Sequence, residues 1–298
     1  MKSLKFNRIF SNTIIYIILT AMSICWVLPI VWLILQSFGD GGIAVKSMLI
    51  PNKFTINNYL YLFSNFTGVT NPLASNHSLD GYFFTWFCNT LVVSIMSCLI
   101  STVFVLGTAY ALSRFRFKAR TAFMKANLVM GMFPGFLSMI IMYWVMKEII
   151  GLDGSYYALV IIYSAGAGGG YYIAKGFFDT ISKNIDEAAM IDGATRSQIF
   201  WQIVLPLAKP IIVYTVLTSF MGPWGDYVTS SYIVGLQNVE NWTVAIGLYQ
   251  FTVGQDVATS YYTQFAAGAV VVAVPITTLF FMLQKYYVSG VTGGAVKG

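Results

Sequence analysis

The stretch NIDEAAMIDGATRSQIFWQIVLPLAKP, residues 184–210, lies between two long apolar runs and constrains the fold more than any other part of the chain. It carries five charged side chains, those of Asp186, Glu187, Asp192, Arg196 and Lys209. Charged side chains are rare inside a bilayer, so this stretch is predicted to lie outside the membrane. Its small, capping and turn-forming residues follow a regular order, which indicates a structured loop that contacts another molecule.

The composition predicts a membrane protein. The chain has 298 residues, of which 57% are hydrophobic and only 9% are charged, and its mean hydropathy is +0.70. A soluble domain has about 25% charged residues, so an ordinary soluble enzyme is excluded. The net charge of +6 comes from short basic clusters at the ends of apolar runs. Such clusters favour control of membrane topology over nucleic-acid binding.

Metal centres are not expected. His77 is the only histidine, and Cys25, Cys88 and Cys98 fall inside or beside apolar runs. Buried reduced thiols explain such cysteines better than a disulfide or a zinc site does. The sequence therefore predicts no bound metal.

Six apolar segments are long enough to cross a bilayer, which takes about 20 residues. They lie near residues 13–38, 85–112, 122–147, 155–175, 210–233 and 263–286. The first segment follows Lys2, Lys5 and Arg8, but it is much longer than the apolar region of a cleavable signal peptide. It is therefore predicted to be a retained span.

The distribution of Lys and Arg predicts the orientation. Fourteen of the 17 lie on one predicted side of the membrane, and the other side has only Lys46, Lys53 and Lys147. Loops rich in Lys and Arg face the cytoplasm, so both termini and the loop 176–209 are predicted to be cytoplasmic. The long outer loops 39–84 and 234–262 either receive a partner or ligand, or only cover the helices; both readings stay open.

Residues 182–193 predict a short helix followed by a turn. Ser182 or Asn184 can cap its start, and Asp186 and Glu187 are expected in its first turn, where the helix dipole favours negative charge. Gly193 permits a left-handed backbone conformation that a side chain would make costly. A first helix that ends at a sharp turn is therefore expected here.

A second short helix is predicted after the turn. Thr195 and Gln198 form a capping-box pattern, T-x-x-Q, which marks a helix start. Pro206 is expected to interrupt this helix, and Pro210 to begin the next span.

The small residues of the first helix indicate docking against a protein. Ala188 and Ala189 lie next to Glu187, and short side chains allow a helix to sit closely in a groove. The alternative is an amphipathic helix on the lipid surface, but that predicts more Lys and Arg on the polar face than this helix has.

The chain shows no energy source of its own. It has no G-x-x-x-x-G-K-[ST] motif, because GAGGGYYIAKG at 166–176 has the wrong spacing. Asp226 is the only acidic residue well inside a predicted span, so no ladder of buried acids suited to ion coupling is present. If the chain takes part in driven transport, another protein must supply the energy.

Two sets of motifs resemble a known family. EAAMIDG at 187–193, nine residues and then IVLP at 203–206 resembles the E-A-A-x-x-x-G-x9-I-x-L-P signature of the membrane subunits of bacterial ABC importers. The carbohydrate-importer branch, the MalG-type maltose/maltodextrin permeases, is similar at FMGPWGDY (220–227), WTVAIGLYQF (242–251), FAAGAVVVAVPIT (265–277) and QKYYVSGVTGGAVKG (284–298). The resemblance is weaker in the first half, where ALSRFRFKAR (111–120) carries it.

The resemblance implies an all-α membrane protein with six transmembrane helices in the type I ABC importer permease fold and both termini in the cytoplasm. It implies one permease domain over 1–298, with a coupling-helix loop at 176–209 and a tail at 287–298. The expected location is the bacterial cytoplasmic membrane, with several passes through the bilayer. The expected partners are a second related permease forming a heterodimer, two cytoplasmic ATPase subunits and an extracytoplasmic sugar-binding protein, with no nucleic acid.

The resemblance also implies roles for particular residues. The chain itself is expected not to be an enzyme and to bind no cofactor, because ATP and Mg lie on the partner ATPase. The coupling residues implied are Glu187, Ala188, Ala189, Asp192, Gly193, Ile203, Leu205 and Pro206. The tail residues expected near the ATPase are Gly293, Gly294, Lys297 and Gly298, the alternative being a frayed, glycine-rich end.

The expected substrate is an oligosaccharide, with a maltodextrin-like glucan as the first candidate. Trp224, Asp226 and Tyr227 are candidate residues of the substrate path, because an acid inside a span is a functional hypothesis by default. The alternative is that Asp226 only bonds to a neighbouring helix.

Other functions stay open at this stage. The chain could be an ABC permease for a different oligosaccharide or a sugar phosphate. In a different class, it could be a stand-alone secondary carrier or channel, or an interaction scaffold without transport. Uptake by the isolated chain, without ATP, would distinguish the carrier or channel.

Overall fold

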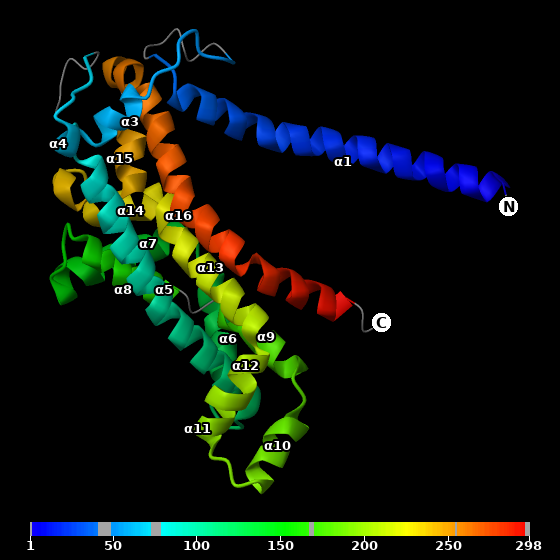
Figure 1. Ribbon diagram of the computed structural model, residues 1–298. Coiled ribbons are helices and arrows are strands. Elements are labelled where there is room, and N and C mark those ends of the chain that lie inside the picture. The colour runs from blue at the N-terminus through cyan, green and yellow to red at the C-terminus, as the bar shows by residue number, and fades with distance from the viewer. Residues whose placement is uncertain (1, 41–48, 73–78, 167–169, 254, 296–298) are drawn as a thin grey trace. The chain divides into compact units, whose positions relative to one another are not determined.

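A computed structural model describes residues 2–40, 49–72, 79–166, 170–253 and 255–295, and Figure 1 shows them as helices joined by loops. Contacts divide the chain into two compact units, one made of residues 1–83 and 248–271, the other of residues 84–247 and 272–298. Two helices, α15 and α16, are divided between the units, and α5 begins at the last residue of the first stretch, Phe83.

The first unit contains three helices of its own and shares two. Its own helices are α1 (Lys2–Ser37), α3 (Asn57–Leu62) and α4 (Ser64–Thr67). The ends of α15 (Val244–Gln250) and the first part of α16 (Gln255–Ala295) complete it. In the most apolar window of Ser11–Ser37 no residue is buried within the chain. An apolar helix that the rest of its own chain does not bury needs lipid or another chain around it.

A buried asparagine holds the first unit together at the end of α1. The Asn58 side-chain amide donates to the carbonyls of Ser37 at 2.9 Å and Gly39 at 2.7 Å. The hydroxyl of Thr263 donates to Asn58 Oδ1 at 2.9 Å. Three segments far apart in the sequence are therefore joined by one fully buried amide, as buried polar groups require.

The second unit contains the remaining helices. They are α5 (Phe83–Arg114), α6 (Arg120–Gly131), α7 (Gly135–Trp144), the π-helical η1 (Val145–Ile150), α8 (Tyr156–Gly166), α9 (Tyr171–Thr180), α10 (Lys183–Ile191), α11 (Arg196–Gln198), the π-helical η3 (Ile199–Val204), α12 (Leu205–Leu207), α13 (Lys209–Gly225), α14 (Tyr227–Val234) and the 3₁₀ turn η4 (Val239–Asn241). Figure 1 shows α10, α11 and α12 gathered at the end of this unit where α5 ends.

An apolar cluster fills that end of the second unit. Its centre is Tyr110 of α5, whose ring lies 4.6 Å from that of Phe200 and 6.0 Å from that of Phe178. Aromatic pairs at such distances add to the free energy gained by burial. The other buried members are Val105, Leu106, Ala109, Leu112, Tyr171, Ala174, Ala189, Ile199, Val204, Ala208 and Ile211.

The number of spans agrees with the prediction only in part. Among the described residues, three helical segments are long and apolar enough to cross a bilayer: Ser11–Ser37, Phe83–Arg114 and Tyr261–Tyr286. Two bent helix pairs, Arg120–Gly131 with Gly135–Ile150 and Arg196–Leu207 with Lys209–Gly225, raise the number to five. The remaining predicted span, 155–175, is divided between α8 and α9, with 167–169 outside the described residues.

A proline causes the sharper of the two bends. The axes of Arg120–Gly131 and Gly135–Ile150 differ by 101°, and Pro134 is the residue before α7 with an extended ψ of 128°. Proline lacks the N–H that a continuous helix needs, so the helix is interrupted there.

Candidate functional site

The loop 176–209 is built from short helices whose ends are capped as the sequence predicts. Ser182 precedes α10, and its hydroxyl accepts from the N–H of Asn184 at 3.3 Å. Asp186 lies in the first turn, where its charge complements the helix dipole. Glu187 lies one residue beyond it, in the second turn, so its expected place in the first turn is wrong. Of the two predicted caps, Ser182 is the one used, so the helix starts at Lys183, two residues earlier than an Asn184 cap would start it.

Gly193 ends α10 in the left-handed conformation. Its φ is +84°, and its N–H donates to the carbonyl of Met190 at 3.1 Å. The N–H of Ala194 reaches back to the carbonyl of Ala189 at 2.9 Å. These two bonds form a Schellman motif, which satisfies the last carbonyls of the helix and reverses the chain.

The capping box that starts the next helix is confirmed. The Thr195 N–H donates to Gln198 Oε1 at 2.8 Å, and the Gln198 N–H donates to Thr195 Oγ1 at 3.3 Å. Two backbone donors that a helix start leaves unsatisfied are thereby paired. The turn between α10 and α11 is fixed on both sides.

Pro206 does not interrupt the second helix, contrary to expectation. It stands at the first positions of α12, directly after the π-helical residues Ile199–Val204, where a missing N–H is tolerated. The helical path continues to Leu207 and breaks at Ala208. Beyond that break Lys209–Gly225 departs at 82°.

The helix α10 has two different faces. Asp186 and Ala189, three residues apart, are the only buried residues of α10. The other seven residues of α10 are exposed. We call five of them, which follow Lys183 and Asn184 of the first turn, the outer face of α10: Ile185, Glu187, Ala188, Met190 and Ile191. Ile191 is 86% exposed. An apolar side chain presented this openly on a loop predicted to face water indicates a surface that another protein covers.

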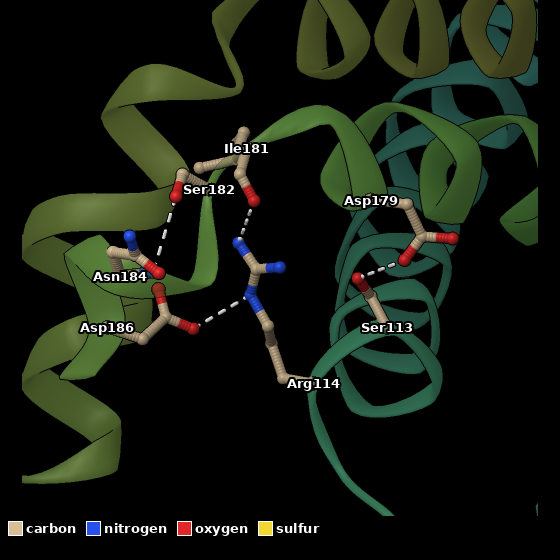
Figure 2. Close-up of polar contacts among 7 residues, drawn as sticks. All are labelled: Ser113, Arg114, Asp179, Ile181, Ser182, Asn184 and Asp186. Atoms are coloured by element: carbon tan, nitrogen blue, oxygen red, sulfur yellow. Dashed lines mark hydrogen bonds and ion pairs between the residues drawn. The ribbon is translucent and has the colours of Figure 1, made fainter.

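The buried face of α10 is held by an ion pair. Arg114 Nε lies 2.8 Å from Asp186 Oδ2, and Arg114 Nη2 donates to the carbonyl of Ile181 at 3.0 Å. Figure 2 shows the guanidinium between the end of α9 and the start of α10. Arg114 is the last residue of α5, so one side chain joins three helices.

A second polar contact lies beside the ion pair. The hydroxyl of Ser113 donates to Asp179 Oδ1 at 2.6 Å (Figure 2), and Lys175 Nζ donates to Asp179 Oδ2 at 2.6 Å. Partial burial acts to raise the pKa of Asp179, but the bonds from Lys175 and Ser113 outweigh it and hold that pKa below its usual value. Asp179 is therefore ionised at neutral pH.

Sequence reasoning missed Ser113, Arg114 and Asp179. The sequence presents Arg114 as one of the basic residues that set the topology and as part of ALSRFRFKAR (111–120), and Asp186 as a charge near a helix start. The spacing of Asp186 and Ala189 is a signal that could have marked the inward face of α10, because residues three apart share a face. The identity of the partner arginine, 72 positions earlier, has no local signal.

The other predicted coupling residues lie at different depths. Asp192 follows α10 as its C-cap and is exposed, as is Pro206. Ile203 and Leu205 are partly buried and pack against the apolar cluster around Tyr110. Glu187 and Ala188 thus face outward, whereas Ala189 packs inside the chain.

The predicted substrate-path residues meet at a break between two helices. Asp226 separates α13 from α14, and its carboxylate accepts from the Thr229 N–H at 2.9 Å and from the Tyr163 hydroxyl at 3.0 Å. Both oxygens are bonded within the chain, in the manner of the alternative considered from the sequence. Tyr227 begins α14.

Trp224 is buried at this break without a partner for its N–H. It is 3% exposed, and its ring lies 5.2 Å from that of Phe87 and 5.9 Å from that of Phe220. Its Nε1 has no hydrogen-bond partner within the described chain. A cavity of about 230 Å³ is lined by the preceding residue Pro223 and by Ser101, Val105, Tyr163, Tyr214, Thr215, Thr218 and Ser219, but not by Trp224 itself. The hydroxyls of Ser101, Tyr163, Thr215 and Thr218 already donate within the chain.

The C-terminal residues predicted to contact a partner are only partly described. Gly293 and Gly294 lie within α16, which runs to Ala295. Lys297 and Gly298 lie outside the described residues.

The sequence of the chain matches a known family of transport proteins. Residues 103–293 match the family described as binding-protein-dependent transport system inner membrane component. The galactooligosaccharides transport system permease protein GanQ of Bacillus subtilis (strain 168) is 36% identical over 299 residues, which cover 100% of both chains. The maltodextrin transport system permease protein MdxG of the same organism is 34% identical and covers 98% of both chains.

Further relatives agree with these. The maltodextrin transport system permease protein MalD of Streptococcus pneumoniae (strain ATCC BAA-255 / R6) is 32% identical over 99% of both chains. A chain in the crystal structure of a bacterial ABC transporter involved in the import of the acidic polysaccharide alginate is similar in fold, with a TM-score of 0.72. It is 24% identical, and the match covers 94% of this chain and 97% of that one.

Proposed function

Because the chain belongs to the family of binding-protein-dependent transport system inner membrane components, we propose that it is the membrane-spanning subunit of an ATP-driven oligosaccharide importer. It forms half of the translocation pathway and pairs with a second, related permease. ATP and Mg bind to two separate cytoplasmic ATPase subunits, and an extracytoplasmic sugar-binding protein delivers the substrate. Six spans place both termini, and the loop 176–209, in the cytoplasm.

The outer face of α10 is the observation that carries this proposal. Ile191 is 86% exposed, and Ile185 and Met190 are about half as exposed, at 38% and 40%. Glu187 supplies a charge on the same face, and Ala188 supplies a short side chain that permits close approach. An exposed apolar centre with a polar edge has the composition of a protein–protein contact.

The ATPase drives transport by displacing this face. When the two ATPase subunits close on ATP, they carry α10 and the adjoining α11 with them, and the spans turn so that the cavity opens outward. Hydrolysis returns the spans to the inward-facing arrangement. The energy of the cycle comes from the ATPase, which is consistent with the lack of a nucleotide-binding motif in this chain.

The substrate is an oligosaccharide of neutral sugars. The relatives at 36% and 34% identity carry the names of galactooligosaccharide and maltodextrin permeases, and a maltodextrin-like glucan stays the first candidate. Trp224, Asp226 and Tyr227 contribute to the substrate path. Trp224 Nε1 is a buried donor with no partner within the described chain, so a sugar hydroxyl could pair with it only after the break between α13 and α14 opens.

The tail completes the contact with the ATPase. Gly293, Gly294, Lys297 and Gly298 reach toward the ATPase pair, where small residues permit a close backbone approach. The outer loops 39–84 and 234–262 meet the sugar-binding protein.

Purification of the chain with its native partners tests the proposal. ATPase activity and sugar uptake are measured in proteoliposomes with a panel of oligosaccharides and binding proteins. We expect one class of oligosaccharide to stimulate both. Trp224→Ala is expected to lower uptake without loss of assembly; wild-type uptake in this variant and in Asp226→Ala would remove both residues from the substrate path.

The competing function is a stand-alone carrier or channel. It predicts that the isolated chain in liposomes moves solute along a gradient, without ATP. The proposed function predicts no uptake under these conditions.

A further inference from the structure

The contact that fixes α10 to the rest of the chain is unusually small. Of the nine residues of α10, only Asp186 and Ala189 are buried. Ala189 offers one methyl group to the apolar cluster, so apolar burial alone holds this helix weakly. The side chain of Asp186, 11% exposed, contacts Arg114, which is 3% exposed. The orientation of α10 therefore depends largely on one ion pair.

The geometry of Arg114 suits it to set an orientation. Its guanidinium contacts Asp186 through Nε and the Ile181 carbonyl through Nη2 (Figure 2). These groups flank the junction between α9 and α10, so the two contacts fix both position and direction of α10 against α5. The planar guanidinium of arginine holds two acceptors in a rigid arrangement, which a lysine cannot do.

Stability alone does not explain the pair. The cost of removing two charges from water offsets much of their attraction, and apolar side chains often replace such pairs without loss. Arg114 Nε, Arg114 Nη1 and Asp186 Oδ1 are buried with no well-aligned hydrogen bond within the described chain, which adds to that cost. The 2.8 Å contact of Nε with Asp186 is therefore an ion pair rather than a hydrogen bond. The rings of Tyr110, Phe178 and Phe200 already provide this end of the unit with an apolar core.

We propose that Arg114 is the positioning residue for energy coupling: through Asp186 it makes α10 and α5 move as one body. This inference rests on the proposed function. When the ATPase displaces the outer face of α10, the ion pair passes the displacement to the end of α5, a 32-residue helix apolar enough to span the bilayer. Ser113, bonded to Asp179, secures the same end of α5 to α9.

The test uses the complete transporter in proteoliposomes, with its partner permease, ATPase and binding protein. The quantities measured are ATP hydrolysed, sugar imported per ATP, and ATPase retained after purification. Arg114→Gln and Asp186→Asn are each expected to retain the ATPase but to lower sugar imported per ATP at least tenfold. Lys147→Gln with Asp153→Asn removes an exposed pair with an N···O distance of 3.9 Å and serves as the matched control; it is expected to transport as the wild type does.

The double variant Arg114→Gln/Asp186→Asn separates positioning from stability. It leaves no buried charge unpaired, so a merely structural role predicts recovery of transport per ATP. The proposal predicts that coupling stays at least tenfold lower, because the rigid two-point contact is still missing. Recovery in the double variant would overturn it.

A conservative variant keeps the test usable if Arg114→Gln does not assemble. Arg114→Lys retains the charge, so it is expected to assemble and to lower sugar imported per ATP by an intermediate factor. The proposal would be contradicted if the two single variants, Arg114→Lys and Asp186→Asn, both imported as much sugar per ATP as the wild type. ATP-independent uptake by wild-type complex would instead refute the proposed function, so the two failures are distinguishable.

Discussion

At the residue scale, the loop 176–209 depends on a few side chains with little freedom to change. Gly193 takes a φ of +84° that other residues adopt only with strain. Thr195 and Gln198 satisfy the backbone at the next helix start. Arg114 and Asp186 join α5 to α10. These residues determine the direction of α10 and therefore which residues its outer face presents.

Gly193→Ala is expected to weaken the turn without adding any steric clash. A left-handed alanine costs about 1–2 kcal/mol, while no atom outside the local chain lies within 4 Å of the added Cβ. The variant should lower the unfolding temperature of the purified complex and the amount of ATPase that it retains. Gly176→Ala, at a helical glycine with equal space, is the control and should change neither.

Asp179 predicts a limited dependence on pH. Its folded pKa lies below the usual value, so its bonds to Ser113 and Lys175 stabilise the fold above the unfolded pKa and are lost as pH falls through the folded pKa. The protection of amides at the end of α9, which is the slowing of their exchange relative to that of an unfolded peptide at the same pH, should therefore be constant from about pH 5 to 8 and lower only in stronger acid. Asp179→Asn should remove this loss of protection in acid. If the variant loses protection in acid as the wild type does, another group is responsible.

At the element scale, α10 is a short helix with an inner face held by the chain and an outer face offered to a partner. The sequence predicted Ser182 as one of two candidate caps of α10, the turn at Gly193 and the Thr195 cap of α11, because these residues act through local backbone bonds. It predicted the helix break wrongly, since Pro206 is accommodated after a π-helical segment and the bend falls at Ala208. The position of a π-helical segment depends on how the helix packs against its neighbours, which a local sequence pattern does not encode.

Ile191→Glu tests the outer face of α10. Burying a new charge in a contact between proteins is costly, so the variant should lose the ATPase during purification while the permease subunits stay together. Ile191→Leu keeps an apolar side chain of equal size and is the matched control. Full retention of the ATPase in Ile191→Glu would show that this face is not the contact.

At the scale of the whole molecule, the sequence predicted a helical membrane protein of the right family, whereas its six spans stay a prediction, because the described residues contain three to five helical segments that could cross. The prediction of a membrane protein rests on composition and charge placement over many residues, so an error about a single helix does not change it. Spans interrupted at Pro134 and Ala208 bend by 101° and 82°. No hydropathy average reveals a bend, and none reveals the ion pair between Arg114 and Asp186, because their separation in the sequence is large.

The orientation predicted from Lys and Arg can be tested by labelling. Cys25, Cys88 and Cys98 are first replaced by Ser, and single cysteines are then placed at Ser197 and Thr67, both exposed. A membrane-impermeant maleimide added to intact cells should label Thr67→Cys and leave Ser197→Cys unlabelled until the membrane is opened. The reverse pattern would place the loop 176–209 outside the cell.

The most direct measurement of the central claim is sugar uptake by proteoliposomes under matched conditions. One sample contains this chain with its partner permease and the ATPase, and the other contains the same permeases without the ATPase. We predict uptake only in the first, and only when ATP and the sugar-binding protein are both supplied. Equal uptake in the sample without the ATPase would contradict the account, because the chain would then need no external source of energy.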